Sequence, residues 1–116
     1  MIGYAGQVSD IRIVLCTFPE AVVARQIGTV LVEKQLAACV NLIPAVESIY
    51  RWQGRLETTT EVLAIFKTSA AMAPVLEREL AALHPYAVPE IMALEPTAVA
   101  APYAAWVGKF DSPLDC

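Results

Sequence analysis

Residues 48–57 read SIYRWQGRLE, a pattern typical of the tip of a β-hairpin, and the rest of the predicted fold follows from this hairpin. Gln53 and Gly54 fit a compact two-residue turn between two strands. Such a loop predicts two cross-strand pairs, Trp52 with Arg55 and Tyr50 with Glu57. The segments on either side extend the hairpin in both directions.

Both arms of this hairpin are long. Ala38–Pro44 and Val46–Trp52 form the incoming arm, and Pro44 marks a bulge, a bend or an edge because proline cannot donate to the ladder. Leu56–Thr68 forms the returning arm. Arms of roughly 13–15 residues reach ~45 Å, whereas a compact domain of this length has a radius of gyration near ~13 Å. Because an isolated two-stranded ribbon is marginal in water, we expect the hairpin to pair with a neighbouring subunit.

The rest of the chain supplies the other elements of a small α+β domain. We predict a buried strand at Ile11–Thr17, helices at residues 19–36 and Ala71–Leu83, a strand at Ile91–Glu95, and a closing helix from Pro102 to Phe110. This order indicates a ferredoxin-like βαββαβ sandwich with an added C-terminal helix. Helices on one face leave the other face of the sheet bare, to be covered by symmetric copies.

We divide the chain into a flexible leader (residues 1–10), one domain (residues 11–110) and a polar tail (residues 111–116). Val23, Ile27, Val30, Leu31 and Lys34 repeat at helical spacing, which supports the first helix. In the second helix we predict that the buried residues are Met72, Val75, Leu76, Leu80 and Leu83. Gly28 in the first helix suggests a close backbone approach.

Composition excludes several classes of protein. The 116 residues include 8 Lys and Arg against 12 Asp and Glu, a net charge of −4, so no basic cluster is present to bind nucleic acid. No apolar stretch approaches the ~20 residues that a membrane-spanning helix needs. The N-terminal residues lack a signal-peptide pattern, which indicates a cytoplasmic protein. The three cysteines, which are widely spaced, are expected to be reduced thiols.

His84, the only histidine, is predicted at the C-terminus of the second long helix. It is either a capping or hydrogen-bonded residue beside a rigid loop, or a ligand. The second hypothesis depends on Cys16 near the end of the first strand, because a thiolate and an imidazole suit copper or zinc. Two ligands do not complete a site, and no CxxC or HxxxH spacing adds to them.

Three further residues, Cys39, Lys67 and Glu90, carry groups that could take part in chemistry. Cys39, inside an apolar strand, is interpreted as a plain core thiol. Lys67 either extends its amine to the sheet edge or contacts an anion in a cleft. Glu90 is the natural partner for Lys67, as a structural ion pair or as an acid–base pair. Cys116, on the tail, is expected to be exposed and without function.

Five large aromatic side chains lie near predicted strand ends and loops: Tyr50, Trp52, Tyr86, Tyr103 and Trp106. We interpret them first as anchors of a subunit interface, although the same residues could form a ligand pocket. Tyr50, Trp52, Tyr103 and Trp106 are the candidates for the interface. Trp52 opposite Arg55 could also make a cation–π contact.

Several segments together resemble the CutA family of divalent-cation-tolerance proteins, in the same order and at matching separations, from about Ile11 to Phe110. They are LVEKQLAACVNLIP (31–44), SIYRWQGRLE (48–57), the strand that ends in KT (67–68) and LHPYAVPEI (83–91). The resemblance implies a ferredoxin-like subunit assembled as a compact homotrimer, similar in architecture to the PII signalling proteins.

The resemblance also implies a link to divalent metals, with copper(II) as a candidate ligand. The family's proposed ligands are a first-strand cysteine, matched by Cys16, and two adjacent histidines before Pro-Tyr. His84 matches the second histidine, whereas Leu83 replaces the first. Two further departures are Arg51-Trp52 in place of paired aromatics and Ala100-Ala101 in place of a polar helix cap.

Three functions follow as hypotheses. The first is a metal-responsive trimeric binding protein, with Cys16 and His84 at or near a subunit boundary. The second is a PII-like signalling trimer whose intersubunit clefts bind a small anion near Lys67, His84 and Glu90. The residues considered for such a cleft are Lys67, Tyr86, Glu90, Cys39 and Asn41. An enzyme is the least supported, because one histidine and one carboxylate do not define an acid–base pair.

Overall fold

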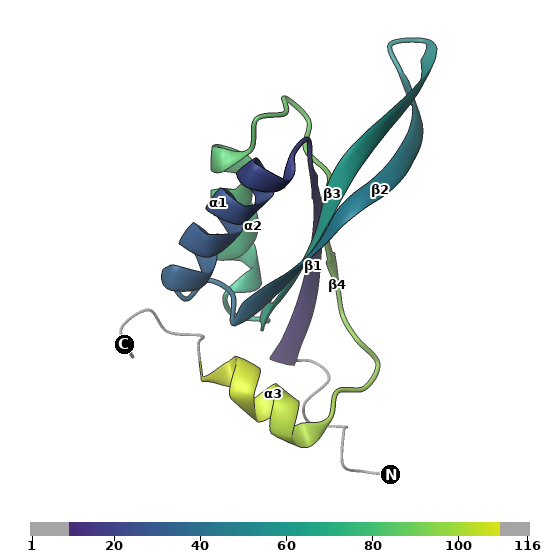
Figure 1. Cartoon of the computed structure of the whole chain (residues 1–116). Helices are drawn as coiled ribbons and strands as arrows, with labels where there is room; N and C mark the ends of the chain where they lie inside the picture. Colours follow the sequence, from purple (N-terminus) through teal and green to yellow (C-terminus); the bar gives the residue numbers. More distant parts are fainter. Residues whose placement is uncertain (1–9, 110–116) are drawn as a thin grey trace.

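Four antiparallel strands form one sheet in the spatial order β2-β3-β1-β4, and two helices cover one of its faces (Figure 1). This computed structural model describes residues 10–109 of the chain. In chain order the elements are β1 (Ile11–Phe18), α1 (Ala21–Glu33), β2 (Cys39–Trp52), β3 (Arg55–Ser69), α2 (Ala73–Leu83), β4 (Ile91–Leu94) and α3 (Ala101–Gly108). The predicted α+β class and the predicted order of elements are confirmed.

The hairpin turn has the predicted geometry. Gln53 and Gly54 form its two-residue loop, and both have positive φ angles, 51° and 78°. Two positive φ angles are the signature of the turns whose twist matches a β-ribbon. Both predicted cross-strand pairs are present, Tyr50 opposite Glu57 and Trp52 opposite Arg55.

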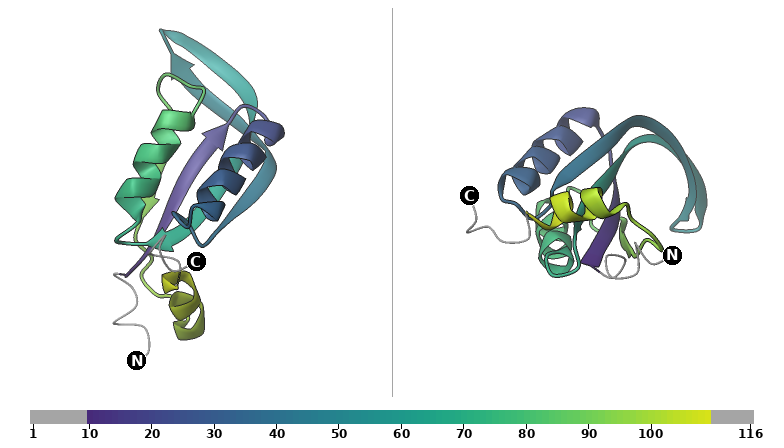
Figure 2. Two further views of the ribbon diagram at one scale, coloured as in Figure 1. Left: turned by 90° about the vertical axis from the view of Figure 1, so that its left-hand side faces the viewer. Right: turned by 90° about the horizontal axis from the view of Figure 1, so that it is seen from below.

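The arms of the hairpin extend past the rest of the sheet and curve away from it (Figures 1 and 2). The pairing of β2 with β3 shifts register between Ile43 and Val46, so the irregularity predicted at Pro44 is confirmed. The longest dimension of the molecule is 47 Å, against 33 and 21 Å for the other two. The predicted overhang of the hairpin is therefore present in the structure.

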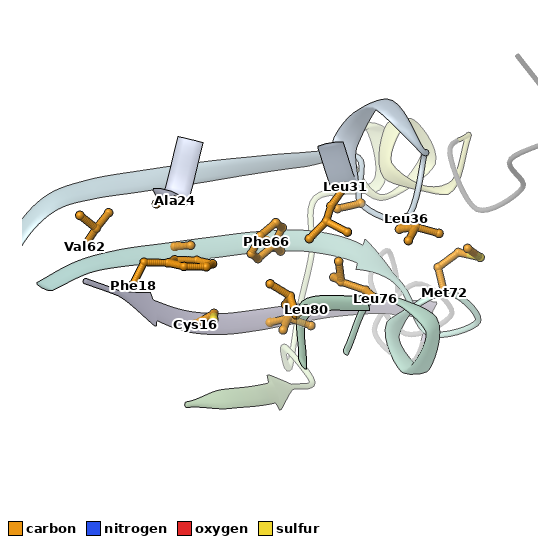
Figure 3. Close-up of a cluster of buried hydrophobic side chains, with 13 residues drawn as sticks. Cys16, Phe18, Ala24, Leu31, Leu36, Val62, Phe66, Met72, Leu76 and Leu80 are labelled. Carbon is orange, nitrogen blue, oxygen red and sulfur yellow. The ribbon is translucent and has the colours of Figure 1, made fainter. Parts of the chain in front are cut away.

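Both long helices pack side by side on one face of the sheet (Figure 2). The core between them and the sheet contains fully buried side chains from β1, β3 and both helices, including Phe18, Leu31, Phe66, Leu76 and Leu80 (Figure 3). An ion pair of 3.1 Å between Lys34 and Glu79 links the end of α1 to α2. Burial of this apolar surface is the main source of stability.

Details of the helices differ from the prediction. α1 ends at Glu33, three residues early, because Gln35 has a φ of 61° that no helix continues through. Leu83, which we predicted to be buried, is 44% exposed. Gly28 does pack closely, but the atom nearest an added Cβ is a side-chain methyl of Val40 at 3.2 Å, not backbone.

The sheet face opposite α1 and α2 is apolar and largely uncovered. It carries Ile13, Leu15, Ile43, Leu63, Ile65, Met92 and Leu94, of which Ile43, Met92 and Leu94 are at least 40% exposed. α3 lies at the end of the sheet remote from the hairpin (Figure 1), where Ala104 and Val107 pack with Ile11. Tyr103 and Trp106, also on α3, stay 40% and 38% exposed.

The predicted division into leader, domain and tail stays a prediction. Residues 1–9 of the predicted leader, Phe110, and the predicted tail with Cys116 lie outside the described residues. Asp10, which we assigned to the leader, accepts a 2.8 Å hydrogen bond from the Ala70 N–H. This hydrogen bond links Asp10 to the residue that follows β3.

Candidate functional site

A cavity of about 670 Å³ lies between the outer part of the hairpin, close to its turn, and the loop that follows α2. Its walls come from β1, β2, β3 and that loop: Thr17, Ser48, Ile49, Tyr50, Trp52, Glu61, Pro85, Tyr86, Ala87, Val88 and Glu90. The cavity has the size typical of small-molecule sites. We refer to it below as the hairpin cleft.

His84 fixes the loop that forms one wall of the hairpin cleft. Pro85 ends α2, and His84 caps the helix in extended conformation, its N–H bonded to the Leu80 carbonyl at 2.9 Å. The Tyr86 N–H donates to Nδ1 of His84 at 3.1 Å, so Nε2 carries the ring proton and donates to the Thr17 carbonyl at 2.7 Å. The ring also stacks on Phe18, with 4.7 Å between centroids. The hydrogen bonds that the first hypothesis predicts for His84 are present.

Cys16 lies in the hydrophobic core and has no exposed surface (Figure 3). Burial raises the pKa of its thiol to about 12, and the negative charges of Glu90 and Glu61 add to this effect. The thiol is therefore protonated at neutral pH. Because the thiolate is the form that binds metals, Cys16 is a poor ligand in this state.

Copper(II) does not fit Cys16 and His84 as they stand in this protomer. Both nitrogens of His84 are engaged in hydrogen bonds, and Cys16 holds its proton. Within residues 10–109 no group of three or more His, Cys, Asp or Glu side chains could hold a metal ion. Binding here would require His84 to give up one hydrogen bond and Cys16 to ionise.

Two carboxylates give the hairpin cleft its charge. Glu61 is 8% exposed, and its Oε2 accepts a 2.7 Å hydrogen bond from the Tyr86 hydroxyl. Burial first, and then this hydrogen bond, raise the pKa of Tyr86. Glu90 is exposed at the cleft rim. No Lys or Arg is among the described residues that line the cleft, so it favours positive charge.

Glu61 was not among the residues predicted from the sequence to form the site. The signal was its strand parity: Glu61 lies on the same side of β3 as Leu63 and Ile65, so it puts a carboxylate next to apolar side chains. An acidic residue at such a position is seldom buried without a partner. The partner, Tyr86, is 25 residues away in the sequence, and only the fold brings the two together.

The remaining candidates lie elsewhere. Lys67 donates to Oδ1 of Asn41 and, at 3.1 Å, to the Ile65 carbonyl. The predicted pairing of Lys67 with Glu90 is therefore wrong. Lys67 lies opposite Ile13, whereas Glu90 directly precedes the residue opposite Cys16, about 10 Å further along β1.

Cys39 is a further correction. We predicted a core thiol, but Cys39 is only half-buried, because its side chain lies on the face opposite α1 and α2. Its Sγ lies 3.5 Å from the Tyr103 hydroxyl on α3. Burial, together with this hydrogen bond, raises the pKa of Tyr103 to about 12. Asn41, Lys67, Cys39 and Tyr103 thus form a second polar cluster, outside the hairpin cleft.

The fold and the cleft define a class: a small α+β protein with an overhanging hairpin and an acidic, aromatic-lined cavity. The chain belongs to the family described as CutA1 divalent ion tolerance protein, which matches residues 12–109. The resemblance noted in the sequence is confirmed.

Relatives and solved structures agree with this assignment. A divalent-cation tolerance protein CutA of Thermus thermophilus is 51% identical over 83 residues, 72% of this chain and 81% of that protein. Protein CutA of Mus musculus is 45% identical over 91 residues, 78% of this chain and 51% of that protein, so the chain spans about half the length of the mouse relative. The crystal structure of CutA from Xylella fastidiosa superposes with a TM-score of 0.86 at 38% identity, and covers 90% of this chain and 100% of that one.

The names of the relatives cover several compartments. A relative from Arabidopsis thaliana is named chloroplastic, and a structure from Archaeoglobus fulgidus is described as periplasmic. In the described part of the chain, no helix has the length and apolar character to cross a membrane. The cytoplasmic location expected from the sequence stays a prediction.

Proposed function

We propose that this protein acts in the response to divalent metal ions as a cytoplasmic, non-enzymatic homotrimer that binds cations. The observation that carries the proposal is the charge of the hairpin cleft, which is walled by Glu61 and Glu90 and by no Lys or Arg among the described residues. Family membership supports the link to divalent ions. We assign the subunit to the ferredoxin-like sandwiches on its strand order β2-β3-β1-β4.

The uncovered sheet face supports self-association. Contiguous exposed apolar surface of this kind marks interaction sites in soluble proteins. Met92 and Leu94, on the edge strand β4, are 48% and 40% exposed, and the hairpin extends beyond its own subunit. A second and a third copy would cover the face and support the hairpin. The number of copies follows the family resemblance.

The cleft charge favours this function over the PII-like alternative. A small anion would need a basic wall, and the proposed base, Lys67, is bonded to Asn41 outside the cleft. A trimer that binds an anion near Lys67, His84 and Glu90 is therefore less well supported. An enzymatic role has no further support, because both nitrogens of His84 are engaged in structural hydrogen bonds.

Two measurements test the proposal. Light scattering at micromolar concentration should give a mass three times that of the 12.5 kDa chain, and a monomer would contradict the trimer. Calorimetric titration of the wild type with copper(II) and zinc(II) should show heat of binding. The double variant Glu61→Gln/Glu90→Gln should show less heat than the wild type. Absence of heat above buffer would remove the metal-binding proposal.

A matched variant separates the two possible copper sites. Cys16→Ala/His84→Ala should leave the copper heat unchanged if the carboxylates bind the ion. Equal heat for the wild type and Glu61→Gln/Glu90→Gln, with loss in Cys16→Ala/His84→Ala, would return the site to Cys16 and His84.

A further inference from the structure

The hairpin cleft combines two kinds of wall. Tyr50 and Trp52 are two residues apart on β2, so their side chains lie on the same side of the ribbon. Tyr86 faces the cleft from the loop after α2. With Glu61 and Glu90, the cleft therefore has three aromatic rings and two carboxylates. No Lys or Arg within residues 10–109 contributes to its lining.

The ring of Tyr86 is held in place by three contacts. Its backbone N–H donates to His84, its hydroxyl donates to Glu61, and its ring packs against that of His84 with 4.8 Å between centroids. Tyr50 and Trp52 line the same cavity from β2. A ring fixed in this way needs little ordering when a ligand arrives, which favours binding.

The size and lining of the cleft suit an organic cation better than a bare metal ion. A divalent ion needs several donor atoms to replace its water, and the described residues hold no group of three or more ionisable metal donors. Aromatic faces cannot replace that water. They do attract weakly hydrated ammonium groups, and a nearby carboxylate adds to the attraction. A volume of about 670 Å³ also exceeds what one ion would fill.

We infer that the hairpin cleft binds an organic ammonium ion, with the cationic head between the rings of Tyr50, Trp52 and Tyr86 and its charge balanced by Glu61 and Glu90. This inference deepens the proposed function, and it rests on that function for the positive charge of the ligand. Trp52 supplies the strongest cation–π surface of the three rings. Glu61 supplies the less solvated of the two charges.

The test compares two probes of equal shape. Choline carries a quaternary ammonium, and 3,3-dimethyl-1-butanol has carbon in place of the nitrogen and no charge. The chain has two tryptophans, so Trp106→Phe, on the remote helix α3, leaves Trp52 as the only indole fluorophore. In that background choline should change Trp52 fluorescence saturably, with an affinity at least tenfold higher than that of the uncharged probe. Equal affinity for the two probes, or no saturable change with choline, would overturn the inference.

Variants assign the binding to the cleft. Trp52→Leu should weaken choline binding at least tenfold by calorimetry, and Trp52→Phe should weaken it less. Glu61→Gln should weaken it about tenfold. Glu90→Gln, at an exposed position that leaves folding intact, should weaken it about threefold. Glu47→Gln is the matched control. Glu47 lies on β2, as Tyr50 and Trp52 do, but its side chain is on the opposite side of that strand and does not line the cleft. If Glu47→Gln weakens choline binding as much as Glu61→Gln and Glu90→Gln do, the binding depends only on the net charge of the protein, and the inference is overturned.

Failure of this inference can be told apart from failure of the proposed function. Copper(II) heat that persists while choline fails to bind removes the ammonium site and leaves the divalent-ion function standing. Choline binding without any copper heat supports the ammonium site and removes metal binding from the proposed function.

Discussion

The hydroxyl of Tyr86 donates a 2.7 Å hydrogen bond to Oε2 of Glu61, and this bond ties the loop after α2 to β3. Glu61 is 92% buried, so the bond replaces water that the carboxylate has lost. The same pair forms a corner of the hairpin cleft. The Tyr86–Glu61 contact therefore both stabilises the fold and shapes the hairpin cleft.

Tyr86→Phe should lower the free energy of unfolding by about 2 kcal/mol, because a buried carboxylate loses a donor. Urea denaturation followed by circular dichroism measures this loss. Tyr50→Phe is the control, since Tyr50 lies at the cleft with 42% exposure, and it should change stability by less than about 0.5 kcal/mol. Equal losses in the two variants would contradict the role assigned to the Tyr86–Glu61 bond.

His84→Ala should loosen the loop at residues 85–90. The substitution leaves the Thr17 carbonyl and the Tyr86 N–H without their side-chain partner and removes the stacking on Phe18. We expect a loss of about 2–4 kcal/mol. Hydrogen exchange should show faster exchange of the Tyr86 amide than in the wild type, and unchanged protection of that amide would argue against the proposed restraint.

The free energy of unfolding should fall as pH rises from 9 to 12. The Cys16 thiol has an ordinary pKa of 9.0, and burial, with the charges of Glu90 and Glu61, raises it to about 12 in the folded protein. Between these values the folded state binds more protons than the unfolded state. The protonated Cys16 thiol therefore makes its full contribution to the free energy of unfolding below pH 9, and this contribution is lost by pH 12. The loss is at most about 1.4 kcal/mol per pH unit for this group.

Cys16→Ala should flatten this alkaline slope, although it lowers stability at pH 7 by creating a small cavity. The pKa of Tyr103 is also raised, to about 12, so Tyr103 contributes to the pH dependence in the same direction. Tyr103→Phe should therefore reduce the alkaline slope further. Urea titrations at intervals between pH 8 and about 11 measure the slopes. An unchanged slope in Cys16→Ala would show that Cys16 titrates normally in the folded state.

Met92→Lys should disrupt the proposed trimer, because it puts a charge on the uncovered sheet face. Val22→Lys is a closely matched control: Val22 is 49% exposed on α1, and Met92 is 48% exposed on β4. Light scattering should show a lower mass for Met92→Lys and an unchanged mass for Val22→Lys. The opposite order would place the subunit interface on the helical face.

Gly54→Ala should lower the free energy of unfolding by about 1 kcal/mol. Gly54 has a φ of 78°, which alanine adopts at a cost, and no neighbouring atom lies within 4 Å of an added Cβ. Gln53→Asn should instead stabilise by a few tenths of a kcal/mol, since Gln53 also has a positive φ and asparagine tolerates it. Thermal denaturation of both variants measures the effects, and equal shifts would contradict this account of the turn.

Local patterns were enough to predict most of the fold. The turn at Gln53-Gly54, the irregularity at Pro44 and the end of α2 before Pro85 all depend on residues adjacent in the sequence. The prediction of which helix residues are buried was less accurate, because burial depends on where a helix lies on the sheet. Leu83 repeats at the correct spacing, yet it lies beyond the edge of the core and is 44% exposed.

By itself, the sequence determined the α+β order, the long hairpin and the resemblance to the CutA family, because each depends on short-range periodicity, turn chemistry or contiguous motifs. Only the tertiary structure decided the site. It brought Glu61 to Tyr86 across 25 positions, engaged both nitrogens of His84, and placed Lys67 with Asn41 rather than with Glu90. The physical reason is that hydrogen bonds and burial depend on strand register and packing between distant segments, which no local pattern encodes.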